Sequence, residues 1–290
     1  MNLDELDDLC DDHPTDDKYS DRVVRAPFSF HGSKSRSIQH IMPHLPVSDV
    51  WVDVFGGSGI VTLNRPSSKK LDVYNDRWSG VVAFFQCIRD PSKRKQMIDQ
   101  LLLMPHSKED FYECKQTWHQ QKDTVERAIR WYYLISTSYG SVGRNWGYGV
   151  ANSFGHKFKN ALKLFPEIGQ KFLHVQIEND DFRVMFERYD SYQTVFYCDP
   201  PYFDSHAAGS YIHLMSEQDH IDLLECVQHA HGYVAVSSYR NKLYDSYDWD
   251  AIHEWEIQGS NHGGQTESNH RVGAKIAAKR MECLYVKDTR

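Results

Sequence analysis

Short runs of apolar residues alternate with stretches of helical periodicity along most of the chain. The runs are rich in Val, Ile, Phe and Tyr and have the length of buried strands. We predict strands at residues 50–54, 71–74, 172–177, 194–198, 232–237, 252–257 and 281–286. We predict helices before about residue 88, at 181–188 and at 216–230. This alternation predicts an α/β fold with a mostly parallel sheet.

The middle of the chain departs from this alternation. Residues 96–138 are expected to be mostly helical. Residues at helical spacing, apolar or aromatic except for the last, are Val125, Ile129, Tyr132, Tyr133 and Ser136. We therefore interpret residues 91–170 as a mostly helical subdomain inserted into the α/β domain.

A glycine-rich segment, residues 136–163, follows these helices and contains no carboxylate. Cations and aromatic side chains are interleaved in it: Arg144, Lys157, Lys159 and Lys163, with Tyr139, Trp146, Tyr148, Phe154 and Phe158. Cations suit the phosphates of a nucleic acid, and aromatic rings suit its bases. An ordinary polar loop around aromatic residues of a small core explains the segment equally well.

The composition excludes several classes of protein. The chain has 290 residues, 40% of them hydrophobic, which is enough for one large domain. No apolar run approaches the ~18 to 20 residues of a membrane span, so we exclude a membrane protein. The N-terminus lacks the order of a signal peptide, and the six cysteines show no C-x-x-C spacing. We therefore expect a protein of the cytoplasm.

The formal net charge of -7 is concentrated at the N-terminus. Residues 1–21 hold nine carboxylates against one base, Lys18, and we expect residues 1–26 to be a solvated, disordered tail ahead of a folded domain at 27–290. The remainder of the chain is close to neutral. The overall acidity therefore does not exclude nucleic acid as a partner.

The most specific local pattern is Asp199-Pro200-Pro201-Tyr202, directly after the apolar run at 194–198. Active sites of parallel sheets lie at the carboxyl ends of strands. The two prolines restrict the backbone, so that the Asp199 carboxylate and a backbone carbonyl can together accept hydrogen bonds from an amino group. Tyr202 offers an aromatic face to a planar base. A rigid surface turn is the alternative.

This D-P-P-Y sequence after a hydrophobic strand resembles the catalytic motif of amino-group methyltransferases. Over roughly residues 27–286 the chain resembles, more narrowly, the Dam-like (alpha-group) DNA adenine N6-methyltransferases. The motif order also agrees, because D-P-P-Y comes after the cofactor segments and a recognition insertion. The resemblance implies a Rossmann-like sheet that binds S-adenosyl-L-methionine (SAM), with helices on both faces and an inserted target-recognition region.

Four further segments contribute to the resemblance. Residues 53–59, D-V-F-G-G-S-G, resemble the motif whose strand and glycine turn hold SAM. Residues 28–34, F-S-F-H-G-S-K, resemble the family's F-x-W-x-G-G-K segment, with a departure at Phe30 and Ser33 in place of the second glycine. Residues 73–76, V-Y-N-D, and 177–182, I-E-N-D-D-F, are similar to the elements at the cofactor's ribose and adenine.

The resemblance implies a set of site residues. The cofactor-binding residues would be Phe30, Lys34, Asp53, Phe55, Gly56, Gly57, Gly59, Asp76, Asp181 and Asp199. The catalytic residues would be Asp199, Pro200, Pro201 and Tyr202.

Each of these assignments has a simpler competitor. Asp53 and Asp76 are also suited to satisfying helix N-termini, the glycines to any tight turn, and Lys34 to solvent. Thr62 stands where a dinucleotide fingerprint requires a third Gly or Ala, which argues against NAD. The sixteen histidines match no zinc spacing, so we predict no metal site.

Our leading hypothesis is site-specific methylation of adenine N6 in double-stranded DNA, with SAM as the donor and the target base flipped out of the duplex. We assign contacts with DNA to Tyr139, Arg144, Asn145, Trp146, Lys157 and Lys159. Arg144 and Asn145 would recognise base edges. The alternatives are an RNA or protein amide methyltransferase and a catalytically silent DNA-binding relative. A prokaryotic, phage or mobile-element origin and a cognate restriction endonuclease as partner are both compatible with the sequence, and the oligomeric state is open.

Overall fold

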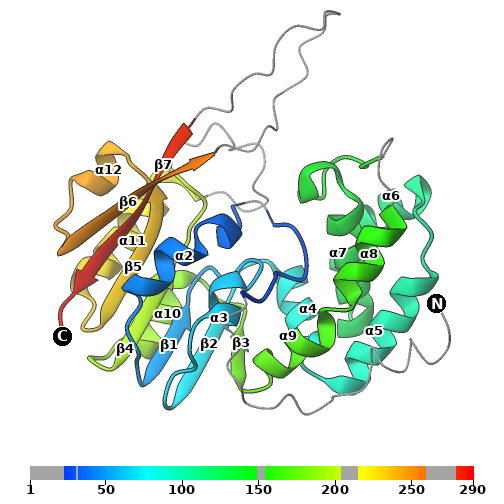
Figure 1. Ribbon diagram of the computed structural model, residues 1–290, viewed down its shortest axis with the longest axis horizontal. Helices are drawn as coiled ribbons and strands as arrows, with labels where there is room; N and C mark the ends of the chain where they lie inside the picture. The colour runs from blue at the N-terminus through cyan, green and yellow to red at the C-terminus, as the bar shows by residue number, and fades with distance from the viewer. Residues whose placement is uncertain (1–22, 31, 149–153, 204–214, 259–278) are drawn as a thin grey trace, which may run out of the picture.

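The computed structural model describes residues 23–30, 32–148, 154–203, 215–258 and 279–290. In Figure 1 the sheet and the helices that cover it form the left part of the molecule, and a second group of helices forms the right part. The acidic segment 1–22 and the polar loop 259–278, both singled out from the sequence, lie outside the described residues.

One sheet of seven strands forms the centre of the α/β part. The strands are β1 Val50–Asp53, β2 Leu71–Asn75, β3 Val175–Glu178, β4 Thr194–Cys198, β5 Tyr233–Tyr239, β6 Ala251–Gln258 and β7 Lys279–Asp288. Their order is β3-β2-β1-β4-β5-β7-β6, with β1 to β5 parallel and β7 antiparallel to both neighbours. The predicted mostly parallel, Rossmann-like sheet is therefore confirmed.

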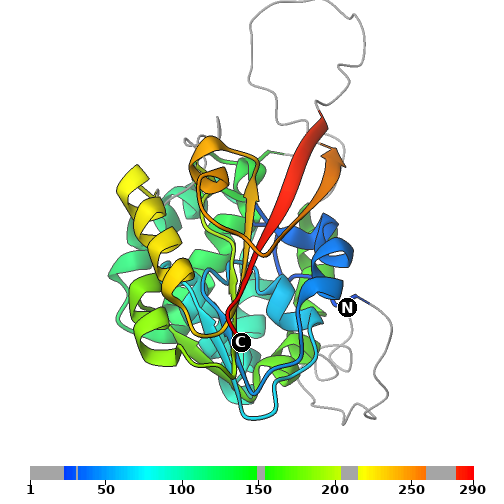
Figure 2. The ribbon, with the colours of Figure 1, turned by 90° about the vertical axis from the view of Figure 1, so that its left-hand side faces the viewer.

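Helices cover both faces of the sheet, as expected of strands with continuous apolar runs. On one face, Val52 packs in the same core as α10 Phe182–Tyr189, α11 Glu217–His229 and the short α12 Lys242–Asp245. On the other face, the neighbouring Trp51 packs with α2 Ile38–Ile41 and α3 Ile60–Asn64. Figure 2 shows α11 and α2 on opposite sides of the sheet.

The remaining helices form a separate hydrophobic core beside the sheet. They are α4 Ser79–Ile88, α5 Pro91–Leu103, α6 Lys108–Thr117, α7 Thr124–Thr137, α8 Phe154–Leu162 and α9 Phe165–Phe172. The central helix is α7, which packs against α4, α5 and α6. Short 3-10 turns complete the chain at η1 Lys34–Arg36, η2 Met42–His44, η3 Trp118–Gln120 and η4 Tyr139–Ser141.

Two expectations from the sequence need correction here. The segment 136–163 is not a continuous loop, because α8 begins at Phe154. The strand expected from Phe172 begins only at Val175, since Phe172 ends α9 and is buried in the helical core. The glycines before residue 150 favour a loop, although apolar residues at helical spacing follow them.

Contacts within the fold also begin ahead of the boundary expected at residue 27, which stays a prediction. Val24 is buried, and the side-chain amide of Asn64 in α3 bonds both its N–H and its carbonyl, at 2.7 and 3.0 Å. The finer division of the chain, including an inserted subdomain at 91–170, remains a prediction, although α5 to α9 occupy that range.

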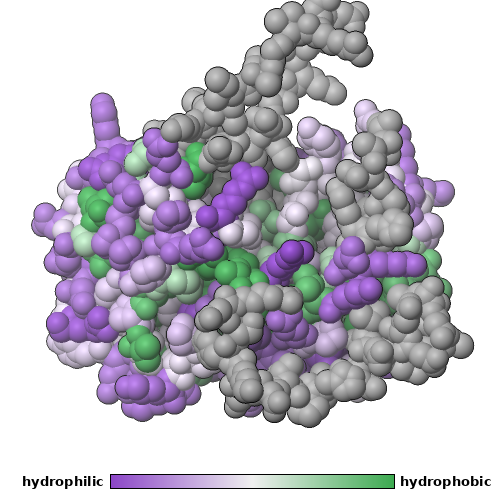
Figure 3. All heavy atoms as spheres, viewed as in Figure 1, coloured by the Kyte–Doolittle hydropathy of each residue, from purple (hydrophilic) through white to green (hydrophobic). Residues whose placement is uncertain are grey.

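The surface in Figure 3 is largely hydrophilic, with apolar side chains scattered between polar ones. None of the helices in the described part of the chain combines the length and apolarity that crossing a membrane requires.

The strand order fixes where a ligand can bind. From β1 the chain continues to its neighbour β2, toward one edge of the sheet, whereas from β4 it continues to β5, toward the opposite edge. The adjacent strands β1 and β4 therefore form a topological switch point. Asp53 ends β1 opposite Tyr197 of β4, which places Asp53 and Asp199 at the same edge of the sheet.

Candidate active site

A tight glycine turn joins β1 to α3 at the switch point. A Cβ on Gly56 would lie 2.1 Å from the ring of Tyr74, so only glycine fits there. Gly59 adopts a φ of 70°, in the left-handed region that favours glycine, and is the N-cap residue of α3. The hydroxyl of Tyr74 donates to the Gly57 carbonyl at 2.7 Å. The turn therefore has one conformation, held against β2.

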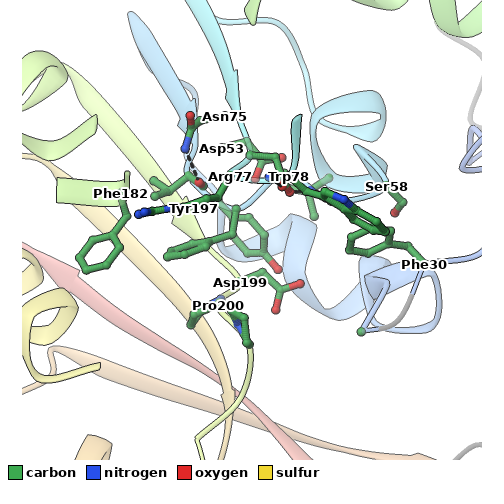
Figure 4. Close-up of a pocket in the computed structure, with 18 of the residues that line it drawn as sticks. Phe30, Asp53, Ser58, Asn75, Arg77, Trp78, Phe182, Tyr197, Asp199 and Pro200 are labelled. Atoms are coloured by element: carbon green, nitrogen blue, oxygen red, sulfur yellow. Dashed lines mark hydrogen bonds between the residues drawn. The ribbon is translucent and has the colours of Figure 1, made fainter. Parts of the chain in front are cut away.

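A cavity of about 440 Å³ opens beside this turn. Its walls come from the glycine turn, residues 75–78, residues 180–183 and the loop after β4. Figure 4 shows Phe30 and Trp78 at one end, Phe182 at the other, and Asp199 and Pro200 between them. The volume and the aromatic walls are typical of a site for a cofactor-sized molecule.

Asp53 provides a polar group in this cavity that lacks a full set of partners. Its carboxylate is buried, and one oxygen accepts a hydrogen bond from the Thr62 hydroxyl at 2.6 Å. The other oxygen has no hydrogen-bond partner among the described residues. Burial raises the pKa of Asp53 to about 7. The hydrogen bond from Thr62 lowers this pKa, whereas the nearby charge of Asp199 raises it further. A buried acceptor of this kind suits the cationic amino group of a ligand.

Asp76, after β2, holds the backbone around the cavity. Its carboxylate accepts the N–H groups of Gly57 at 2.8 Å and Trp78 at 2.7 Å. Burial raises its pKa to about 6, against these two hydrogen bonds. These contacts agree with the simpler interpretation of Asp76, in which it satisfies backbone N–H groups at a helix start. Ribose binding stays a prediction.

Asp181 caps α10 and lies in an ion-pair cluster. It accepts the backbone N–H of Arg183 at 3.1 Å and pairs with the guanidinium groups of Arg183 and Arg77. Arg183 also bonds Asp219 at 2.8 Å at the start of α11. The cluster closes the end of the cavity where Phe182 lies, and contact of Asp181 with adenine stays a prediction.

The loop after β4 places Asp199 against Lys34. The Lys34 ammonium lies 2.6 and 2.7 Å from the two oxygens of this carboxylate and also donates to the Gly32 carbonyl at 2.9 Å. Burial raises the pKa of Asp199 to about 6, and Lys34 opposes that rise. Lys34 was predicted to bind the cofactor. It lines the cavity, but the structure shows its ammonium on Asp199.

Pro200 and Pro201 line the cavity, whereas Tyr202 is not among its lining residues. The Tyr202 ring lies 4.7 Å from the Lys34 ammonium and packs edge-on against Tyr239 at 4.6 Å. Its hydroxyl donates to Glu282 in β7. The stacking role expected of Tyr202 remains a prediction.

The segment expected to contact DNA forms a closed turn next to the cavity. Ser138 and Trp146 form an antiparallel bridge, and Tyr139 N–H donates to the Asn145 carbonyl at 2.8 Å. Arg144 and Asn145 are exposed, and 62% of Tyr139 is accessible to solvent. The turn, residues 138–147, is called the recognition loop below.

Not every aromatic residue of the recognition loop faces outward. Trp146 packs between His106 at 4.2 Å and Phe111 at 5.6 Å, so it belongs to the helical core, as the simpler interpretation of this segment expected. Lys115 of α6 donates to the Arg144 carbonyl at 2.6 Å and braces the loop.

The two remaining lysines assigned to DNA lie in α8 and not in the loop. Lys159 is exposed, and the neighbouring Phe158 is buried against Tyr132. The side chain of Lys157 lies outside the described residues. Contact of either lysine with DNA stays a prediction.

The comparison with protein families agrees with this geometry. Residues 30–260, well over half of the chain, match the model of the D12 class N6 adenine-specific DNA methyltransferases. The chain belongs to this family. As a D12 class methyltransferase it is an enzyme that methylates DNA adenine and that requires a methyl donor.

Curated relatives of this D12 class methyltransferase are named as DNA adenine methylases. The DNA adenine methylase of Salmonella typhi is 24% identical over 243 residues, which cover 80% of this chain and 84% of that protein. The DNA adenine methylase of Escherichia coli (strain K12) is 24% identical over 195 residues, covering 64% of this chain and 68% of that protein. The predicted family, enzyme class and function are thus confirmed.

Two residues of the site were not predicted from the sequence. Asn75 bonds the carbonyls of Val54 at 2.9 Å and Asp180 at 3.1 Å, and so ties three cavity segments together. Glu282 is buried beside Tyr202 and Lys34. The one sequence signal for Glu282 is a carboxylate inside the apolar run of the last strand.

The described residues contain no group of three or more His, Cys, Asp or Glu side chains arranged to hold a metal ion.

Proposed function

We propose that this D12 class methyltransferase transfers the methyl group of SAM to the N6 amino group of one adenine within a specific sequence of duplex DNA. The observation that supports this most directly is the juxtaposition of Asp199 and Pro200 with a cofactor-sized cavity at the switch point. An amino group held by this loop would lie next to whatever the cavity binds.

The residues of the cavity fit SAM. The unpartnered oxygen of Asp53 is suited to the cationic amino group, and the aromatic ends formed by Phe30 with Trp78 and by Phe182 are suited to a planar adenine. When bound, SAM supplies a methyl group that is already activated by its sulfonium centre.

The catalytic contribution of the protein is made by the D-P-P-Y loop. The Asp199 carboxylate and the Pro200 carbonyl would each accept a hydrogen bond from one N–H of the adenine amino group. They would bias its nitrogen toward tetrahedral geometry and stabilise the positive charge that develops there. Lys34 supports this role because it opposes the effect of burial on the pKa of Asp199 and so favours the charged form.

Adenine N6 is out of reach inside a duplex, so the base must rotate out at a cost of a few kcal/mol. We propose that the flipped base stacks on the Tyr202 ring next to Asp199, a contact worth about 1 to 3 kcal/mol. Glu282 and Tyr239 hold that ring in place.

Recognition of the DNA sequence is assigned to the recognition loop and α8. Arg144 and Asn145 are exposed on the loop and would bond base edges, with Tyr139 beside them. Lys157 and Lys159 in α8 would contact phosphates, while Trp146 supports the loop from inside. The enzyme would act where the genome is accessible, in the cytoplasm of a prokaryotic cell.

The test is incubation with methyl-labelled SAM and unmethylated duplex DNA, followed by mass spectrometry of the nucleosides. We expect N6-methyladenine, and we expect it to disappear in Asp199→Ala. The matched control is Asp190→Ala, which removes a carboxylate paired with His231 on the surface. Methylation of RNA or of protein amides without methylation of DNA would contradict the proposal, and so would an active Asp199→Ala variant.

A further inference from the structure

Glu282 is a buried carboxylate in the interior of the sheet. It lies in β7 between Tyr239 of β5 and Trp255 of β6, and 3% of it is exposed. A carboxylate in such a place destabilises the fold unless partners compensate for its lost hydration.

The partners of Glu282 are two residues of the active site. It accepts a hydrogen bond from the Tyr202 hydroxyl, and it lies 3.6 Å from the Lys34 ammonium. The same ammonium lies 2.6 Å from Asp199 and 4.7 Å from the centre of the Tyr202 ring. One cation is therefore shared by the buried Glu282 and the partly buried Asp199, and Glu282 contacts both Lys34 and Tyr202.

We propose that Glu282 is a positioning residue of this enzyme, which fixes the Tyr202 ring through its hydroxyl and competes with Asp199 for Lys34. It touches neither the base nor the methyl donor. Its effect on the reaction passes through Tyr202 and Lys34. The proposal rests on the function proposed above for Asp199.

The charges around Asp199 determine what the loss of Glu282 should do. The titratable groups that face Asp199 are Lys34 of the N-terminal segment, Asp53 of β1, Tyr197 and Cys198 of β4, Tyr244 of α12, Glu282 of β7 and Tyr202 of its own loop. Glu282 repels the charged form of Asp199. Without this charge Lys34 would interact more strongly with Asp199, and Asp199 would stay ionised to lower pH.

The first experiment compares single-turnover methylation rates of the full-length enzyme between about pH 5 and 8, with saturating SAM. Glu282→Gln keeps an oxygen that can accept from Tyr202 but removes the charge. We expect the acid limb of its rate profile to move to lower pH by about half a unit or more. The proposal would be overturned if the fall of the rate at low pH occurred at the same pH in Glu282→Gln as in the wild type. It would also be overturned if the wild-type rate did not fall at low pH within this range.

A surface variant controls for a general effect of carboxylate loss. Glu254→Gln changes a residue on the neighbouring strand β6, where Glu254 pairs with Arg240 at 3.0 Å. Its profile should match that of the wild type. A similar shift in both variants would mean that net charge, and not the position of Glu282, moves the limb.

A second experiment does not depend on Glu282→Gln being folded. Tyr202→Phe removes the hydroxyl and keeps the ring, and we expect kcat/KM for DNA to fall by about 3- to 10-fold with SAM affinity unchanged. Glu282→Ala should lose at least as much, and the double variant no more than Glu282→Ala alone, because both changes break one contact. An unchanged Tyr202→Phe enzyme, or additive losses, would overturn the anchoring of Tyr202.

Failure of the underlying function would look different. If Asp199→Asn methylates adenine at the wild-type rate, the proposed role of Asp199 is wrong whatever the Glu282 variants do. If Asp199→Asn is inactive while the Glu282 and Tyr202 variants behave as the wild type, only the role of Glu282 is wrong.

Discussion

The switch point of the sheet and the recognition loop border the same cavity but are built differently. At the switch point, Asp53 is buried and bonds Thr62, and Asp199 pairs with the buried Lys34 from a distant part of the chain. In the recognition loop, backbone bonds and Lys115 fix the main chain, while Arg144 and Asn145 project from the surface. In the proposed function the chemistry would depend on contacts fixed inside the fold, and the choice of DNA sequence on exposed side chains, which can change at little cost to the fold.

The largest effect should come from Lys34→Met, which removes the cation from the buried pair. The pKa of Asp199 should rise, because burial would no longer be opposed, so the acid limb of the rate profile moves to higher pH. At neutral pH we expect a loss of about 100-fold or more in single-turnover rate. Lys70→Met, at a surface lysine paired with Asp49, is the control. A rate profile unchanged from the wild type would contradict the role of Lys34.

Gly56→Ala should weaken the cofactor half of the site next most strongly. The new methyl group would lie 2.1 Å from the Tyr74 ring, so either the turn or β2 must shift. We expect SAM affinity to fall by about 10- to 100-fold, measured by calorimetry, with a lower melting temperature. Tyr74→Ala in the same chain should recover part of the affinity by making room. If Gly56→Ala binds SAM normally, the turn is not the cofactor cradle.

Arg144→Ala should affect the recognition loop and spare the switch point. Loss of a base-edge contact would reduce discrimination against the wrong base by about 1 to 3 kcal/mol, or roughly 5- to 150-fold. Methylation of a library of DNA sequences would measure it, with SAM affinity as the internal control. An unchanged methylation pattern would remove Arg144 from the recognition residues.

The smallest effect is expected from Lys115→Ala. Lys115 braces the Arg144 carbonyl from an exposed position on α6, and such a bond contributes only about 0.5 to 1.5 kcal/mol. We expect KM for DNA to rise a few-fold and the pH dependence of the methylation rate to stay unchanged. If Lys115 also contacts phosphates, KM for DNA should depend less steeply on salt concentration. A change in the pH profile would show that the two regions are less separate than their contacts indicate.

The strands and the D-P-P-Y loop after β4 could be predicted because both depend on local signals. Continuous apolar runs mark buried strands, and Asp199-Pro200-Pro201-Tyr202 is a fully specified string at the end of one of them. The glycine turn at Gly56 and Gly59 was visible for the same reason.

The contacts that complete the site could not be predicted, because they join residues far apart in the chain. Lys34 and Asp199 are separated by 165 positions, and Tyr202 and Glu282 by 80. Only the sheet order brings these residues together. In the helical part, α8 was not predicted, although Phe154, Phe158 and Leu162 recur at helical spacing, because the glycines ahead of them favour a loop.

Ser141 and Val142 of the recognition loop line the same cavity as the glycine turn. A molecule in the cavity and a DNA duplex on the loop would therefore contact opposite sides of one short segment. By thermodynamic linkage, the factor by which one ligand changes the affinity for the other is the same in both directions. In the proposed function, any coupling between the affinities for donor and DNA would therefore act through Ser141 and Val142, two residues assigned neither to the chemistry nor to the base contacts.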